Sequence, residues 1–173
     1  MNEIIFKNDE VNDIIDGLAA KIIKFKFDLG NLIIAGIKEG GVAPSNIIHE
    51  KVKHATGFNC LLGYVDITLY RDDSFEVKKA VKSTEMPFNI NGKDILLVDD
   101  VICSGRTVRA AIDDLICFGR PKSIKLAVLI DRGDREVPIC PDFTGKKIKI
   151  SDKYDVRVEL DGKNKFIEKI LKV

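Results

Sequence analysis

The segment ILLVDDVICSGRT, residues 95–107, places two adjacent carboxylates at the end of an aliphatic run and a Ser-Gly-Arg-Thr sequence shortly after them. Asp99 and Asp100 stand where a buried strand is expected to emerge. Their charges therefore need a partner, which can be a magnesium ion, a basic side chain or the hydroxyl groups of a ligand. A sugar diol is a suitable donor pair for carboxylate oxygens. The acidic half of the segment thus predicts a site for a cation or a sugar.

The second half of the segment, residues 103–107, is expected to form the turn into a helix. At such a turn the unpaired backbone N–H groups and the positive end of the helix dipole attract an anion. Gly105 permits close approach of a ligand, while Ser104 and Thr107 add hydroxyl donors. A ligand with a diol one sugar's width from a phosphate satisfies both halves, and a phosphoribosyl group has this structure.

Other interpretations of this segment stay open. A strand that ends in Asp-Asp also occurs in acidic metal pockets such as those of phospho-acceptor receiver domains, and Ser104 or Thr107 can merely cap the helix. The spacing GxxxxGK[ST] of a nucleoside-triphosphate P-loop is absent from the sequence. Nucleoside-triphosphate chemistry is therefore disfavoured.

Composition limits the partners of the chain. The 173 residues fit one globular domain, residues 1–173, and the 28 basic residues nearly cancel the 27 acidic ones. A formal charge of +1 gives no general attraction to nucleic acid or to an acidic membrane, although a local basic patch remains open. The four cysteines have no metal-type spacing, and no apolar run approaches the roughly 18 residues of a membrane span. We therefore expect a cytoplasmic protein.

Hydrophobic patterns predict the elements that position the two carboxylates. Apolar residues recur at helical spacing from 9 to 29 and from 44 to 56, and the continuous aliphatic runs are too short for helices. The predicted order is helix 9–29, strand 32–37, helix 44–56, strand 58–70, strand 93–100, helix 105–119 and strand 123–131. This alternation indicates an α/β fold with a mostly parallel sheet, whose ligands lie at the carboxyl ends of the strands.

Two regions depart from this alternation. The charged segment 71–84 has weak periodicity and is a candidate long functional loop. Beyond Asp131 the pattern breaks into the short pieces RGDREVPICPDFTGKK, KIKIS and YDVRVEL. These pieces predict a small irregular or antiparallel appendage over one edge of the sheet.

The segment 95–107 also resembles the phosphoribosyl diphosphate (PRPP) motif of type I phosphoribosyltransferases. That motif has four aliphatic residues, two acids, two apolar residues, a variable position and Ser/Thr-Gly, and every position matches. Together with LGYVDITLYRDD and GRPKSIKLAVLIDRGDREVPICPDFTGKKI, it is similar to the pyrimidine operon attenuator/uracil phosphoribosyltransferase family. The resemblance implies a mostly parallel sheet flanked by helices, with a small hood region formed mainly near the C-terminus.

The same resemblance implies roles for individual residues. Asp99 and Asp100 would hold the ribose hydroxyls, Cys103, Ser104, Gly105, Arg106 and Thr107 the 5′-phosphate, and Lys38, Glu39, Gly40 and Gly41 the pyrophosphate. Asp131 and Arg132 would contact the base, and Asp131 would join Asp99 and Asp100 in binding Mg²⁺. Tyr70 and Arg71 would open a flexible loop that closes over the reacting sugar. The implied reaction is attack of a nucleobase nitrogen on C1 of PRPP, with loss of magnesium pyrophosphate.

The chain differs from the family pattern at several of these positions. Glu39-Gly40 replaces the usual Thr-Arg of the pyrophosphate loop, so the loop has an anion in place of a cation. This difference predicts low activity, which Glu39→Thr combined with Gly40→Arg would raise. Cys103 replaces the usual Tyr, or the Asp of purine enzymes, and thereby disfavours purine salvage. Asp134 replaces the usual His, so RNA binding is expected to be weak.

The leading hypothesis is a uracil phosphoribosyltransferase linked to regulation of pyrimidine biosynthesis, acting as a homodimer or higher homo-oligomer. One alternative is a purine-type salvage phosphoribosyltransferase. The other is a non-catalytic regulator that senses PRPP or nucleotides and binds RNA.

Overall fold

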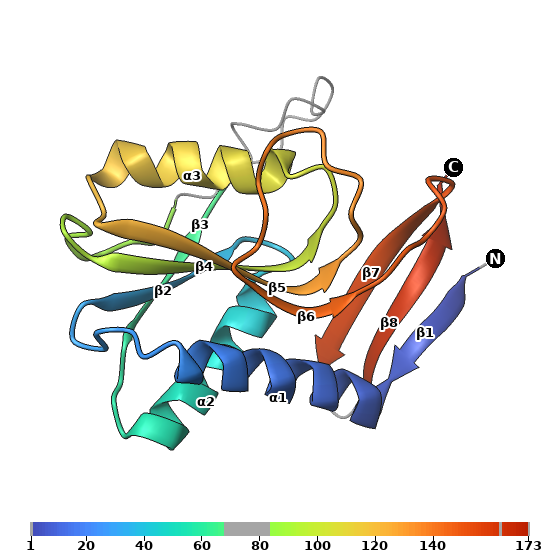
Figure 1. The fold of residues 1–173 in the computed structure, drawn as a ribbon, viewed down its shortest axis with the longest axis horizontal. Coiled ribbons are helices and arrows are strands. Elements are labelled where there is room, and N and C mark those ends of the chain that lie inside the picture. Colours follow the sequence, from blue (N-terminus) through green and yellow to red (C-terminus); the bar gives the residue numbers. More distant parts are fainter. Residues whose placement is uncertain (1, 68–83, 163, 173) are drawn as a thin grey trace.

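The computed structural model describes residues 2–67, 84–162 and 164–172. A five-stranded parallel sheet, in the order β3-β2-β4-β5-β6, forms the centre, and a three-stranded antiparallel sheet, β1-β8-β7, lies beside it (Figure 1). The elements are β1 Glu3–Lys7, α1 Asn8–Lys24, β2 Leu32–Ile37, α2 Val42–Thr56, β3 Leu61–Val65, β4 Asp94–Ile102, α3 Arg106–Phe118, β5 Ser123–Asp131, β6 Phe143–Lys147, β7 Tyr154–Asp161 and β8 Asn164–Leu171.

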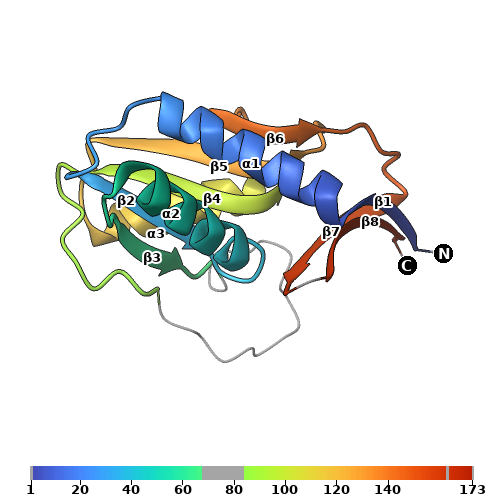
Figure 2. The same cartoon turned by 90° about the horizontal axis from the view of Figure 1, so that it is seen from below.

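The parallel sheet is buried on both faces, because α3 covers one face while α1 and α2 cover the other (Figures 1 and 2). The side chains of each central strand alternate between two cores. In β2, Leu32 and Ile34 pack with the α1 and α2 side, whereas Ile33 and Ala35 pack with the α3 side. This two-sided burial explains why β2, β4 and β5 are continuous aliphatic runs in the sequence.

The register of the central strands brings their carboxyl ends to one edge of the sheet. In β2 and β4, Ile33 pairs with Ile95 and Gly36 pairs with Val98. In β4 and β5, Ile102 pairs with Asp131. The loops that follow these three neighbouring strands consequently lie next to one another, as in other open parallel sheets.

The α/β architecture predicted from the sequence is confirmed, including a parallel sheet flanked by helices. The predicted strands 32–37 and 123–131 coincide with β2 and β5. The first helix ends at Lys24, earlier than predicted. The predicted long loop 71–84 lies, apart from residue 84, outside the described residues.

The strands outside the core of the parallel sheet differ from the prediction. The segment FTGKK does not belong to an appendage but forms β6, a fifth parallel strand in which Thr144 pairs with Val128 of β5. The antiparallel sheet combines β7, which contains the predicted piece YDVRVEL, with β8 and β1, two strands that the sequence analysis missed. Glu3 of β1 pairs with Lys169 of β8. We call this three-stranded sheet the hood.

Among the described helices, none combines the length and apolar character needed to cross a lipid bilayer. The longest of them, α1, instead buries one face made of Val11, Ile15, Leu18 and Ile22. Its other side carries charged residues, as expected for an amphipathic helix that packs on a sheet.

Candidate active site

Three loops form the candidate site at the carboxyl edge of the parallel sheet. Residues 38–41 connect β2 to α2, residues 103–105 connect β4 to α3, and residues 132–142 follow β5. The strands β2, β4 and β5 are neighbours in the sheet, so these loops are brought together by the topology. The sequence-predicted residues on the first two loops and at the end of β4 therefore share one site.

The two carboxylates occupy the end of β4 in different environments. Asp99 is buried, and its Oδ1 accepts a hydrogen bond from the backbone N–H of Asp100 at 3.0 Å. Asp100 is half-buried, and its Oδ1 accepts a hydrogen bond from the backbone N–H of Val101 at 2.6 Å. Burial raises the pKa of the Asp100 carboxyl above its ordinary value, while these hydrogen bonds act in the opposite direction. A ligand that brings positive charge or hydroxyl donors would relieve this desolvation.

The loop 103–105 leads directly into α3, and the N-cap residue Gly105 has no side chain that could cap the first N–H groups of the helix. Gly105 has a φ of 89°, a conformation that glycine adopts without the steric cost of a side chain. A Cβ at this position would also stand 2.9 Å from Cγ2 of Val137. Ser104 Oγ accepts a hydrogen bond from the backbone N–H of Arg106 at 3.3 Å. The geometry is that of a helix N-terminus able to hold a phosphate.

The loop 38–41 lies against the end of β4. A Cβ on Gly40 would overlap the carboxylate of Asp100, and a Cβ on Gly41 would overlap the carbonyl oxygen of Val98. Glu39 has a φ of 74°, in the left-handed region that non-glycine residues seldom adopt. Lys38 Nζ forms an ion pair with Glu85 Oε1 at 2.8 Å. The two glycines thus permit the close approach of this loop to the carboxylates.

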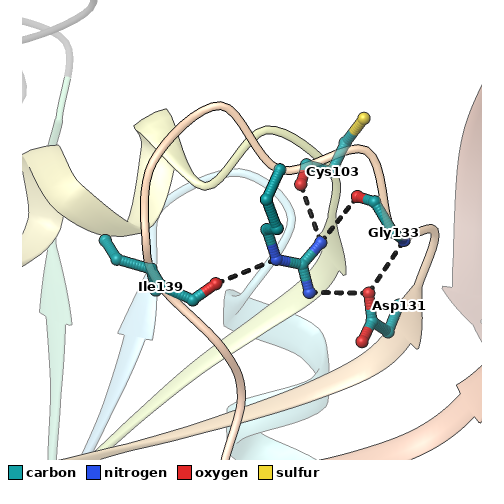
Figure 3. Close-up of polar contacts among 5 residues, drawn as sticks. Cys103, Asp131, Gly133 and Ile139 are labelled. Carbon is teal, nitrogen blue, oxygen red and sulfur yellow. Dashed lines mark hydrogen bonds and ion pairs between the residues drawn. The ribbon is translucent and has the colours of Figure 1, made fainter.

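Asp131, at the end of β5, is engaged by residues of its own loop. Its Oδ1 accepts hydrogen bonds from the backbone N–H of Gly133 at 2.9 Å and from Arg135 Nη2 at 2.6 Å (Figure 3). Asp131 is buried, and the guanidinium of Arg135 provides its counter-charge. The structure therefore commits one oxygen of this carboxylate to protein contacts.

Arg132 lies between the parallel sheet and the hood. Its side chain is 3% exposed, and its Nη1 donates to Asp155 Oδ1 of β7 at 3.2 Å. The buried Nε has no hydrogen-bond partner among the described residues. Arg132 is thus both an ion-pair partner of the hood and a source of one unused donor.

Mg²⁺ requires oxygen ligands, which the carboxylates of the predicted residues can supply. Within the described part of the chain, no three His, Cys, Asp or Glu side chains are grouped so as to hold a metal ion. The Asp99-Asp100 pair nevertheless fits the usual Mg²⁺ pattern, which uses one or two carboxylates together with substrate oxygens and water. The predicted participation of Asp131 stays a prediction, and the Arg135 ion pair opposes it.

Sequence reasoning missed two residues that the structure brings to this site. Arg135 contacts Cys103 and Asp131, and Glu136 Oε2 accepts a hydrogen bond from Nε of Arg106 at 2.6 Å. The charged run RGDRE, residues 132–136, indicates that these side chains form ion pairs, but the sequence does not show with which residues Arg135 and Glu136 pair. Arg71, predicted to open the flexible loop, lies outside the described residues.

Comparison with known proteins agrees with the geometry. A model of the phosphoribosyl transferase domain matches residues 1–161. The protein named "Bifunctional protein PyrR" of Microcystis aeruginosa is 44% identical over 164 residues, which cover 92% of this chain and 93% of that protein. The protein of the same name from Pelotomaculum thermopropionicum is 42% identical over 168 residues, covering 94% of this chain and 93% of that protein.

Solved structures show the same fold at low sequence identity. A hypoxanthine phosphoribosyltransferase from Staphylococcus aureus has a TM-score of 0.68 and 20% identity, covering 85% of this chain and 77% of that chain. A hypoxanthine-guanine-xanthine phosphoribosyltransferase has a TM-score of 0.68 and 21% identity, covering 98% of this chain and 94% of that chain. These structures share the architecture with this chain.

Proposed function

The chain belongs to the phosphoribosyl transferase family, as a type I enzyme of the pyrimidine operon attenuator/uracil phosphoribosyltransferase group, and on this premise we propose that it transfers the phosphoribosyl group of PRPP to uracil. One observation carries the proposal. Asp99 and Asp100 lie in the last four residues of β4, and the short loop 103–105 leads from β4 directly to the N-terminus of α3. A diol and a phosphate of one ribose would occupy them together.

Different residues of the segment 99–107 would bind the two ends of the sugar. Asp99 and Asp100 would accept hydrogen bonds from the ribose hydroxyls. The backbone N–H groups of the 103–107 turn, with the hydroxyls of Ser104 and Thr107, would donate to the 5′-phosphate. Holding both ends of the sugar fixes the position of C1 relative to the incoming base, which converts binding energy into a lower barrier.

The loop 38–41 would receive the leaving pyrophosphate. The backbone N–H groups of Lys38 and Gly41 already donate to the carbonyl oxygens of Val65 and Ile37. The N–H of Gly40 and the ammonium of Lys38, which pairs with Glu85, would therefore donate to the developing negative charge, and such donors are worth about 2.7 to 4 kcal/mol each in other anion-stabilising sites. A magnesium ion bound at Asp100 would supply further charge neutralisation. The carboxylate of Glu39 adds negative charge to the same loop, so we expect turnover to be low.

Asp131 and Arg132 would recognise the base beside the hood. The buried Nε of Arg132 is a donor suited to a carbonyl oxygen of a pyrimidine. Cys103 lacks a carboxylate that would assist protonation of a purine nitrogen. Hypoxanthine and guanine also carry a carbonyl oxygen, so it is Cys103, not Arg132, that favours a pyrimidine over the alternative of purine salvage.

The test is pyrophosphate release from PRPP and Mg²⁺ with uracil, cytosine, hypoxanthine, guanine or no base. We expect release to depend on uracil. Asp99→Asn should abolish this release, whereas Asp113→Asn, on the exposed face of α3, should not change it. Release that depends on hypoxanthine or guanine would establish the purine alternative, and no release with any base would refute the catalytic proposal.

A second candidate function is regulation of pyrimidine biosynthesis through RNA. It is favoured by the word "bifunctional" in the names of both relatives. A net charge of +1 and the acidic Asp134 lead us to expect weak, salt-sensitive binding. Fluorescence anisotropy with a pyrimidine-operon leader RNA, at two salt concentrations and with or without UMP, tests this function. Light scattering on the same samples measures whether the protein is a homodimer or a larger oligomer.

A further inference from the structure

The phosphate-binding turn is held from behind by the segment 133–139, which we call the strap. Arg135 Nη1 donates to the carbonyl oxygen of Cys103 at 2.7 Å. The carbonyl oxygen of Ser104 accepts from the backbone N–H groups of Glu136 at 3.0 Å and Val137 at 3.2 Å. Figure 1 shows this part of the chain rising beside the N-terminal end of α3. Two consecutive carbonyl groups of the turn are thus fixed by the strap.

The directions of the Cys103 and Ser104 carbonyl groups determine where the backbone N–H groups of Ser104 and Gly105 point. In a trans peptide the C=O and the following N–H point in opposite directions, and the described residues contain no cis peptide. Because the carbonyls of Cys103 and Ser104 point to the strap, the N–H groups of Ser104 and Gly105 point away from it. Two donors therefore face the side on which a phosphate would bind.

Arg135 is fixed in place by acceptors on several sides (Figure 3). Besides Cys103, its guanidinium donates to the carbonyl oxygens of Gly133 at 2.7 Å and Ile139 at 2.9 Å, and to Asp131 Oδ1 at 2.6 Å. Its side chain is 18% exposed. A planar guanidinium with five N–H donors can bridge four acceptors in fixed directions, which the compact ammonium group of lysine cannot.

We propose that Arg135 is a positioning residue, which orients the backbone donors of Ser104 and Gly105 for the 5′-phosphate of the ribosyl substrate. This inference rests on the proposed function. Arg135 itself does not touch the phosphate, because its guanidinium is committed to the four acceptors on the strap side. Without it, the Cys103 carbonyl is free to rotate and the donor pair is no longer preorganised.

The strap also contacts the turn through side chains. Glu136 pairs with Arg106, and Val137 packs where a Cβ on Gly105 would lie. These contacts hold the turn near the strap when Arg135 is replaced. Loss of Arg135 should therefore change the orientation of the donors more than the fold.

The experiment compares Arg135→Lys and Arg135→Gln with Arg109→Lys, a control on α3 whose arginine forms an exposed ion pair with Asp113. Calorimetry measures the dissociation constants for ribose 5-phosphate and, with Mg²⁺, for pyrophosphate. We expect both Arg135 variants to bind ribose 5-phosphate about tenfold more weakly, which corresponds to roughly 1.4 kcal/mol. Pyrophosphate affinity should stay within about twofold of the parent, and the control should be unchanged for both ligands.

Several outcomes would overturn the proposal. A folded Arg135→Lys protein with parental affinity for ribose 5-phosphate would show that the guanidinium is not needed. An equal loss for both ligands would show a general structural role. If the parent binds pyrophosphate but not ribose 5-phosphate, the assigned phosphate site is refuted, and with it this inference. If the parent binds both ligands but releases no pyrophosphate with any base, the proposed reaction fails while the role of Arg135 in phosphate binding is still measured.

Discussion

Gly40 and Asp100 are so close that a Cβ on residue 40 would overlap the Asp100 carboxylate. The loop 38–41, which we propose receives pyrophosphate, is thus in contact with a carboxylate that we propose holds the ribose. Changing either residue should affect both halves of the site.

Gly40→Ala should lower the rate of pyrophosphate release by about 10²-fold, because displacing a bound group by about 1 Å costs that much in well-oriented sites. The matched control is Gly17→Ala in α1, where an added Cβ meets nothing within 4 Å. That control should leave the rate unchanged and stabilise the helix by up to about 1 kcal/mol. Equal rates for Gly40→Ala and the parent would contradict the assignment of this loop.

Restoring the family sequence with Glu39→Thr and Gly40→Arg should lower activity, which is opposite to the expectation from sequence alone. A β-branched residue is strongly disfavoured at the φ of 74° found at Glu39, and arginine at position 40 would displace Asp100. Glu39→Gly should instead raise the rate, because it removes a negative charge and tolerates this φ. Initial rates at saturating Mg²⁺ compare the three proteins, and a faster double variant would show that the loop rearranges freely.

Asp100→Asn should stabilise the ligand-free protein while removing activity. Burial raises the pKa of Asp100. Below the ordinary pKa of 3.8 the group is protonated in both folded and unfolded states, and its cost to stability appears as pH rises through the raised pKa. The variant should therefore melt higher than the parent near neutral pH, by about 2–4 °C for each kcal/mol gained, and the difference should shrink towards pH 4. Thermal melts across this range measure it.

Thr107→Ala should weaken binding of ribose 5-phosphate by about 1 kcal/mol, the usual worth of a hydrogen bond, and leave stability unchanged. Gly105→Val should weaken binding and also destabilise the protein by about 1–3 kcal/mol, because its φ is 89° and the new side chain meets Val137. Calorimetry and urea unfolding separate the two effects. Parental affinity in both variants would exclude a phosphate at this turn.

Asp155→Ala should lower the free energy of unfolding by about 1–3 kcal/mol, since it leaves the buried Arg132 guanidinium without its ion-pair partner. Lys172→Met is the control, because Lys172 contacts the same carboxylate from an exposed position at 3.5 Å. That variant should change stability by less than about 0.5 kcal/mol. Urea titrations of the three proteins decide whether this ion pair joins the hood to the sheet.

The sequence predicts this fold well wherever burial is two-sided. The strands 32–37 and 123–131 are continuous aliphatic runs, and their bounds coincide with β2 and β5. Strand β6 was assigned wrongly because its position at the edge of the sheet leaves Phe143 as its one buried residue. Strand β1 was missed because it is short and is paired by residues from the other end of the chain. Neither strand has a strong local pattern.

The candidate site is predictable in part for a similar reason. Asp99, Asp100 and Gly105 lie close together in the sequence, so their spacing alone predicts that they belong to one site. Arg135 could not be identified in this way, because three of its four acceptors are backbone carbonyls, which no side-chain pattern reveals. The contact between Gly40 and Asp100 joins two loops that are distant in sequence and depends on the strand order.

The pairing of β1 with β8 has a consequence for the order of folding. Among the described strands, β1 comes first along the sequence and its antiparallel partner β8 comes last. Contacts between segments that are far apart in sequence close long loops, which is costly in entropy until other structure has shortened the path. The parallel sheet should therefore form before the hood. In pulse-labelling hydrogen exchange, amides of β1 should gain protection later than those of β4.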